Sequence, residues 1–92
     1  MFTVVWSDYM KYRAETRGFD LAVLEEILRY GGERYFDSET RRMIAIGKHG
    51  DFVVAVPYEE TDGTITPVTV HVITRQQIRF RLQNGRFKNE QK

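Results

Sequence analysis

The sequence predicts an α+β fold, in which an N-terminal strand and two helices pack on a mainly antiparallel sheet and a further helix lies near the C-terminus. Two apolar runs within residues 41–57, separated by a short connection with two glycines, are typical of a β-hairpin. Apolar residues recur at three- and four-residue spacing between residues 20 and 31, which is typical of an amphipathic helix. Helical patterns come first and strand patterns follow, so we expect helices packed against an antiparallel meander.

A strand and two helices are expected in the first third of the chain. Phe2–Trp6 is rich in β-forming residues and predicts a strand beside the hairpin. Ser7 is the expected N-cap of a helix over Asp8–Arg17, which a glycine ends. A second helix is expected to begin after Asp20 and to end at Gly31. Its apolar stripe predicts a face that covers one side of the sheet.

The hairpin at residues 41–57 is expected to lie at the centre of the sheet, with the five residues Gly47 to Asp51 as its connection. In both strands, the residues that face one side of the sheet and the residues that face the other side are apolar. A strand that is apolar on both faces is covered on both faces, so other elements must pack on each side. In the first strand, Ile44 and Ile46 are expected on one face, and Met43 and Ala45 on the other. In the second strand, one face is expected to carry Phe52, Val54 and Val56, and the other Val53 and Ala55.

Shorter elements flank the hairpin. Residues 34–36 predict a short strand or an extended entry to the hairpin, followed by a polar turn over residues 37–40. After a polar loop at residues 59–63, a strand is predicted over Ile65–Ile73. Pro67 has no amide donor, so this strand is expected to begin at an edge or a bulge. From there on, Val68, Val70 and Val72 are expected on one face, and Thr69, His71 and Ile73 on the other.

A helix and a basic tail are predicted at the C-terminal end. Thr74 is the expected N-cap of a helix over Arg75–Asn84, which Gly85 ends. We therefore predict a single α+β domain over residues 1–85 and a basic, flexible tail over residues 86–92.

Composition excludes several classes of site. The chain has no cysteine, which excludes disulfides and thiolate metal sites, and its two histidines are too few to suggest zinc. We expect no metal and no cofactor. No apolar run approaches the length of a membrane span, and no signal-peptide pattern opens the sequence, so the cytoplasm is the expected location.

The net charge of +1 conceals an uneven distribution of charged residues. Residues 1–40 carry eight acids and five bases, whereas residues 75–92 carry six bases and one acid. Clustered arginine and lysine are typical of a surface that binds the phosphates of nucleic acid. A solvated C-terminal end is the alternative interpretation, and the charge count alone does not separate the two.

The candidate chemistry is cleavage of RNA. Attack by a 2′-hydroxyl needs a group that takes its proton, charge that stabilises the phosphorane, and help for the leaving 5′-oxygen. A histidine such as His71 can act as acid or base near neutral pH, and arginines can bind the phosphate in bidentate fashion. The alternative for His71 is a partly buried histidine that only hydrogen-bonds a neighbour. The residues that can form such a site, if the hairpin base, the last strand and the final helix converge, are Arg41, Arg42, His71, Arg75 and Arg79.

Several stretches resemble the BrnT family, the toxin half of a type II toxin–antitoxin pair, and related small domains. They are Trp6-Ser7-Asp8 near the start, Arg17-Gly18-Phe19-Asp20 with the apolar stripe that follows, SETRRMIAIG with FVVAVPYEE at residues 38–60, and VHVITRQQIRFR at residues 70–81. The chain differs from the family's pattern in having Tyr9 where relatives often have a histidine.

The resemblance implies a compact RelE/ParE-like α+β fold, endoribonuclease activity without a metal, and a DNA-binding antitoxin as protein partner. Together with the residue chemistry, it gives a predicted catalytic set of Arg41, Arg42, His71 and Arg75. The predicted RNA-binding set is Thr74, Arg79, Arg81 and Arg86.

Two alternatives remain open at the level of sequence. The same fold can serve as a non-catalytic module that binds protein or RNA, or as a plain soluble domain whose basic tail aids solubility. A homodimer is a further expectation, because the strands at Phe2–Trp6 or Ile65–Ile73 can pair across a two-fold axis if they lie at sheet edges.

Overall fold

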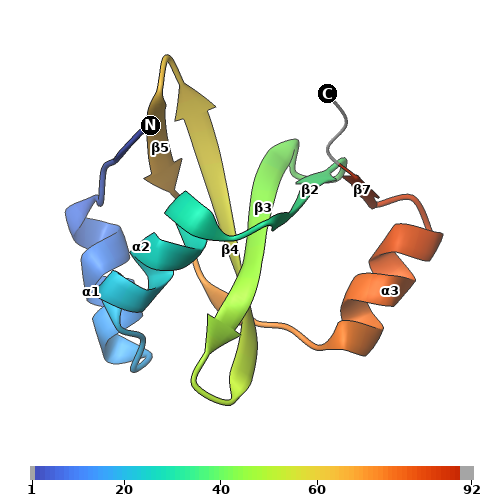
Figure 1. Cartoon of the computed structure of the whole chain (residues 1–92), viewed down its shortest axis with the longest axis horizontal. Coiled ribbons are helices and arrows are strands. Elements are labelled where there is room, and N and C mark those ends of the chain that lie inside the picture. Colours follow the sequence, from blue (N-terminus) through green and yellow to red (C-terminus); the bar gives the residue numbers. More distant parts are fainter. Residues whose placement is uncertain (1, 90–92) are drawn as a thin grey trace.

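A mainly antiparallel sheet with helices on both faces makes up the fold, and the computed structural model describes residues 2–89. In Figure 1, helices α1 and α2 lie on one side of the sheet and α3 lies on the other. Within this part of the chain, the strands follow the order β1-β5-β4-β3-β2-β7, and β6 pairs with β4. The elements are β1 (Thr3–Val4), α1 (Asp8–Thr16), α2 (Leu21–Tyr30), β2 (Glu33–Asp37), β3 (Arg42–His49), β4 (Phe52–Thr61), β5 (Thr64–Pro67), β6 (His71–Val72), α3 (Arg75–Gln83) and β7 (Phe87–Asn89).

The predicted hairpin is confirmed and forms the centre of the sheet as β3 and β4. Its connection is shorter than expected, because His49 pairs with Phe52 and leaves only Gly50 and Asp51 in the turn. Gly50 has φ +62°, in the left-handed region that glycine adopts without strain. The prediction of two covered faces is also confirmed: Ala45, Val54 and Val56 belong to one buried cluster, and Ile44, Ile46 and Ala55 belong to another.

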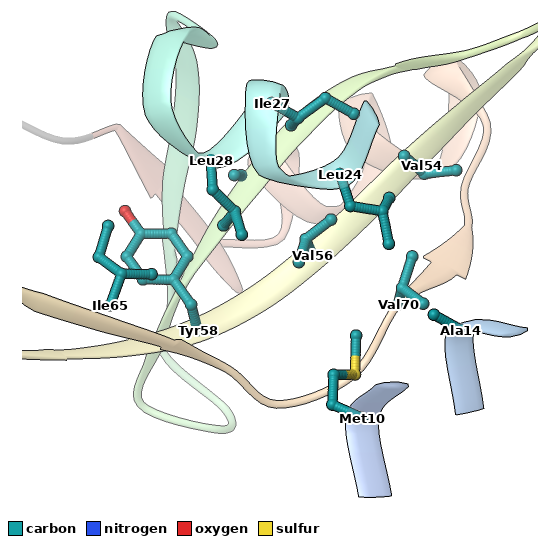
Figure 2. Close-up of a cluster of buried hydrophobic side chains, with 11 residues drawn as sticks. Met10, Ala14, Leu24, Ile27, Leu28, Val54, Val56, Tyr58, Ile65 and Val70 are labelled. Atoms are coloured by element: carbon teal, nitrogen blue, oxygen red, sulfur yellow. The ribbon is translucent and has the colours of Figure 1, made fainter. Parts of the chain in front are cut away.

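Helices α1 and α2 cover the first face. Figure 2 shows the side chains of Leu24 and Leu28 directed from α2 toward Val56 and Tyr58 of β4, while Met10 enters from α1. The caps follow the sequence: Ser7 accepts a hydrogen bond from the backbone N–H of Met10, and Asp20 accepts one from that of Ala22. The two helices and the stripe of α2 are therefore as predicted.

Helix α3 covers the second face. Ile78 is buried against Ile44, Ile46 and Ala55, and Leu82 packs at the margin of this cluster. Thr74 and Gln77 form a capping box, in which each side chain bonds the backbone N–H of the other residue. The C-terminal helix is confirmed, although it is not the last element of the described chain.

The strand predicted over Ile65–Ile73 is interrupted. Tyr58 of β4 pairs with Pro67 and Ala55 pairs with His71, so two residues of β4 lie opposite the three residues Val68, Thr69 and Val70. One extra residue is a β-bulge, and it shifts every later side chain to the opposite face of the sheet. Val70 consequently joins the α1/α2 core, and Val72 lies on the same face, opposite Val54. Thr69, His71 and Ile73 share the α3 side as predicted. The prediction is wrong only for Val68, which lies on the α3 side and not with Val70 and Val72.

Two further expectations are wrong. Residues 86–89 are not a flexible tail, because Phe87–Asn89 forms β7 and pairs with β2. Phe87 is buried, and its ring stacks on Tyr35 with centroids 5.5 Å apart. Residues 90–92 of the predicted tail lie outside the described residues. The expected polar loop at residues 59–63 is mostly strand, since β4 continues to Thr61 and turns at Asp62 and Gly63.

The strands that were expected to pair in a homodimer are placed differently from one another. β1 lies at the end of the strand order, as a sheet edge does, and it pairs in parallel with β5, so the expectation of a strand directly beside the hairpin is wrong. β5 lies between β1 and β4, so it is not an edge.

Among residues 2–89, none of the helices is long and apolar enough to cross a membrane.

Candidate functional site

A cavity of about 160 Å³ lies on the α3 side of the sheet and brings together four basic residues, from β3, β6, α3 and the turn after α3. We call it the His71 cavity. Its floor is apolar and comes from β3, β4 and Phe87, and its polar groups come from β2, β3, β6, α3 and the turn after α3. The residues that line it are Asp37, Thr40, Arg42, Ile44, Ala55, Pro57, Val68, Thr69, His71, Arg81, Arg86 and Phe87.

The bulge before β6 directs His71 into this cavity. Without the extra residue, the alternation that starts at Pro67 would place His71 on the face of α1 and α2. With it, His71 lies opposite Ala55, on the same face as α3. The imidazole is half-buried there. The position of this histidine is therefore set by backbone geometry.

The surroundings of His71 disfavour its charged form. Burial lowers the pKa of His71 below its ordinary value of 6.5, and the positive charges of Arg81, Arg17 and Arg86 lower it further. The imidazole is consequently neutral at pH 7 and has a ring nitrogen that can accept a proton. A neutral histidine among cations is suited to act as a base beside a bound anion.

Three guanidinium groups line the His71 cavity, and they differ in how they are held. Arg42 pairs with Glu59 of the neighbouring strand at 3.2 Å; the Arg42 side chain is partly buried and that of Glu59 is exposed. Arg86 is held in a bidentate pair with Asp37, with both N···O distances 3.0 Å. Arg81 lies over the Phe87 ring, 5.5 Å from its centroid. Within residues 2–89, no carboxylate lies at ion-pair distance from Arg81, so its charge is the one best placed to meet an anion.

Asp37 positions Arg86. Its carboxylate is 2% exposed and accepts hydrogen bonds from Arg86 and from the backbone N–H groups of Glu39 and Thr40. Burial by itself would raise the pKa of Asp37, but the bonds from Arg86 and from the two amides lower it overall. Asp37 is therefore ionised at neutral pH and fixes the guanidinium at the margin of the cavity.

The predicted catalytic set is only half assembled. Arg42 and His71 line the same cavity. Arg75 instead donates from Nη1 to both carboxylate oxygens of Glu33, at 2.8 and 2.7 Å, and is absent from the lining of the cavity. Arg41 is exposed in the turn before β3, where its φ is +61°. The proposal of one surface formed by Arg41, Arg42, His71 and Arg75 is thus not met.

The predicted RNA-binding set divides in the same way. Arg81 and Arg86, both from the basic cluster at residues 75–92, line the His71 cavity. Thr74 is used as the N-cap of α3, and Arg79 is exposed on that helix outside the cavity.

Sequence reasoning missed Asp37 and Thr40. Both were assigned to a polar turn, which is correct for Thr40, but Asp37 is the last residue of β2 and is buried. Asp37 meets Arg86 across 49 residues of sequence, and nothing local distinguishes it from a solvated turn residue. The only sequence feature that indicates a role for Asp37 is its place as an acidic residue at the end of a strand, and this feature is weak.

The second histidine has a different role. His49 accepts a hydrogen bond at Nε2 from the backbone N–H of Asp20, 2.9 Å away, and its ring meets the edge of Phe19. It connects the end of β3 to the start of α2. His49 is not among the residues of the His71 cavity.

Among residues 2–89, no group of three or more histidine or carboxylate side chains is arranged to hold a metal ion. The chemistry that the His71 cavity offers is that of a neutral imidazole and three guanidinium groups around a space suited to a small anion. Comparisons of the chain with protein-family models, with curated proteins and with solved structures found no match.

Proposed function

We propose that this chain is a metal-independent endoribonuclease that cleaves RNA at the His71 cavity, acting as the toxin of a type II toxin–antitoxin pair in the cytoplasm. The observation that carries the proposal is the meeting of a neutral imidazole with three guanidinium groups in one cavity. A volume of about 160 Å³ is below the range of pockets that hold drug-sized ligands, so it suits a phosphate group and not a whole nucleotide.

The proposed step is attack by the 2′-hydroxyl on the adjacent phosphorus. His71 takes the proton of the hydroxyl, the 2′-oxygen forms a bond to phosphorus, and the bond from phosphorus to the 5′-oxygen breaks. The guanidinium of Arg81, with Arg86 beside it, stabilises the charge that develops on the phosphorane oxygens. The leaving 5′-oxygen is protonated by the imidazolium or by water, and the products are a 2′,3′-cyclic phosphate and a 5′-hydroxyl.

The assignment as a toxin is supported by the α+β fold and by the resemblance to the BrnT family described above. A DNA-binding antitoxin is the partner that this resemblance implies. Induced expression is expected to arrest bacterial growth, and co-expression of the product of the adjacent gene is expected to relieve the arrest. Growth at the normal rate during verified expression would contradict the assignment as a toxin.

A binding module without catalysis is the second candidate, and one observation favours it. Two of the three guanidinium groups are already paired, Arg42 with Glu59 and Arg86 with Asp37. Such pairs reduce the positive charge that is available to a phosphate. The reduced charge suits weak binding of an anion more than it suits stabilisation of a dianionic transition state.

The test is incubation of the purified chain with single-stranded RNA in the presence of excess EDTA. The expected result is cleavage with 2′,3′-cyclic phosphate ends, and resistance of the same oligonucleotide when the ribose at the cleaved position is 2′-deoxy. Intact RNA that is nevertheless bound would favour the binding module. Cleavage that EDTA abolishes would contradict the metal-independent mechanism.

A further inference from the structure

An open groove runs beside the His71 cavity along α3. It has a volume of about 890 Å³ and is lined by Ser38, Glu39, Gln76, Gln77, Phe80, Arg81, Asn84, Gly85 and Arg86. We call it the α3 groove. It shares Arg81 and Arg86 with the His71 cavity, so the two spaces are adjacent and the same two guanidinium groups lie at their boundary.

Phe80 is the unusual member of this lining. Ile78 and Leu82 direct the apolar side of α3 to the sheet, and Phe80 lies between them in sequence, on a different side of the helix. Its side chain is 63% exposed, although Ile78 and Leu82, two residues away on either side, pack in the core of this face. An exposed phenylalanine in a polar groove does not contribute to the folding of the chain in the way that a buried one does.

The other side chains of the α3 groove are polar or charged: two are basic and one, Glu39, is acidic. Gln76 and Asn84 bring amide groups, and Arg81 and Arg86 bring positive charge. An exposed aromatic ring with cations and amides beside it is the combination that proteins use for unpaired nucleotides: the base stacks on the ring, the amides meet the base edge, and arginine meets the phosphate.

We infer that the α3 groove binds one unpaired nucleobase of RNA, stacked on Phe80, while the phosphate of the same or the adjacent nucleotide lies between Arg81 and Arg86 at the mouth of the His71 cavity. The inference rests on the proposed function for the identity of the polymer. It adds that the substrate is single-stranded at this position, because a base within a duplex cannot leave its neighbours to stack on a side chain without a cost in free energy.

One residue of the α3 groove opposes the phosphate. Glu39 pairs with Arg86 at 3.2 Å, and its side chain is 68% exposed. Its carboxylate must give up this contact or share the guanidinium when a phosphate binds. Recognition therefore depends strongly on stacking at Phe80, since charge at Arg86 is already partly neutralised by Glu39 and Asp37.

The test measures the binding of a fluorescently labelled, fully 2′-O-methylated single-stranded RNA by anisotropy. This probe cannot be cleaved by 2′-hydroxyl attack, so binding is measured apart from catalysis. The variants are Phe80→Ala and Phe80→Trp, and the matched control is Phe52→Ala. Phe52 is the same residue type with nearly the same exposure, 60%, and lies outside the α3 groove.

Phe80→Ala is expected to weaken binding about 10-fold or more, because stacking of a base on an aromatic ring is lost. Phe52→Ala is expected to bind the probe as tightly as the wild type does. Phe80→Trp is expected to bind it as tightly as the wild type or more tightly. A second probe with abasic sugars is expected to bind the wild type and Phe80→Ala equally and weakly. An RNA duplex is expected to compete poorly with the single strand.

Three outcomes would overturn the inference or separate it from the proposed function. Equal affinity of wild type and Phe80→Ala for the single-stranded probe would overturn the stacking site even if RNA is cleaved. Absence of binding to any RNA would overturn both proposals. A Phe80-dependent affinity in a protein that leaves natural RNA intact would support the base site and contradict the ribonuclease.

Discussion

At the scale of the residue, the charge state of His71 determines what the His71 cavity can do. Burial and the nearby guanidinium groups lower its pKa, so the imidazole is neutral under conditions in which an exposed histidine would be partly charged. A neutral imidazole has one ring nitrogen that can accept a proton, and it carries no positive charge. His71 is therefore suited to the first step of 2′-hydroxyl attack and not to binding the phosphate as a cation.

The pH dependence of cleavage follows from this state. We predict that kcat/KM rises with pH through a single apparent pKa below 6.5 and levels off by about pH 7, because only the neutral imidazole accepts the proton. Arg17 contributes to the lowered pKa from outside the cavity. Arg17→Met is expected to move the rising limb to higher pH without changing the plateau. A rate that falls as pH rises over this range would show that the imidazolium is the active form.

At the scale of the element, the contact of α2 with the central hairpin depends on Gly47. A Cβ atom at this position of β3 would lie 2.6 Å from Cγ1 of Ile27 and 2.9 Å from its Cγ2 and Cδ1. Those atoms belong to a branched side chain that is itself buried in the core. The missing side chain of Gly47 lets α2 pack closely on the sheet.

Gly47→Ala is therefore predicted to lower the free energy of unfolding by about 1–3 kcal/mol, the usual cost of an overpacked core. Gly32→Ala is the matched control, since its Cβ would meet nothing within 4 Å and its backbone does not require glycine. The measurement is urea denaturation followed by circular dichroism. Ile27→Ala removes all three contacting atoms, so Ile27→Ala/Gly47→Ala should lose less stability than the sum of the two single variants. Equal stability of Gly47→Ala and the wild type would contradict the close contact.

The strand β7 pairs with β2, and an ion pair with a buried carboxylate holds its start to the sheet. Arg86 precedes β7 and bonds Asp37 at the end of β2, and the backbone N–H of Ser38 donates to the carbonyl of Arg86 at 2.8 Å. Asp37 is buried, so removing its partner leaves a charge without compensation. This pair explains why residues 86–89 are ordered into the sheet although their composition is that of a tail.

Arg86→Ala is predicted to destabilise the chain by about 3 kcal/mol, whereas Lys88→Ala, an exposed position on the same strand, should change stability by less than about 0.5 kcal/mol.

The pKa of Asp37 is lowered in the folded state, so the unfolded chain binds more protons in acid. The stabilisation by the pair is complete above the ordinary pKa of 3.8 and is lost as pH falls through the lower folded value. Denaturation midpoints that do not differ between Arg86→Ala and wild type at pH 7 would contradict this role.

At the scale of the whole molecule, the two faces of the sheet differ in how much apolar surface they bury. The face under α1 and α2 holds the larger apolar cluster, with Met10, Leu24 and Leu28 fully buried. The face under α3 has a smaller cluster, and the His71 cavity and the α3 groove both lie along that helix. Stability comes mainly from one face, which leaves the other free to present charge.

Elements with a strong local pattern could be predicted from the sequence. The central hairpin, α1 and α2 with their caps, and the capping of α3 by Thr74 all follow from spacing within about ten residues. The bulge at residues 68–70 and the strand β7 could not be predicted, because each depends on pairing with a distant segment. The same reason separates the predicted site residues: Arg42, His71, Arg81 and Arg86 meet, whereas Arg41 and Arg75 do not.

The most direct test of the central claim compares the rate of RNA cleavage by wild type and His71→Asn at pH 7 in the presence of EDTA. Loss of the base is predicted to lower the rate by at least about 100-fold, while affinity for the 2′-O-methylated RNA stays unchanged. His49→Asn is the matched control and should cleave at nearly the wild-type rate once its folding is verified, because His49 lies outside the His71 cavity. Cleavage by His71→Asn at the wild-type rate would contradict the account.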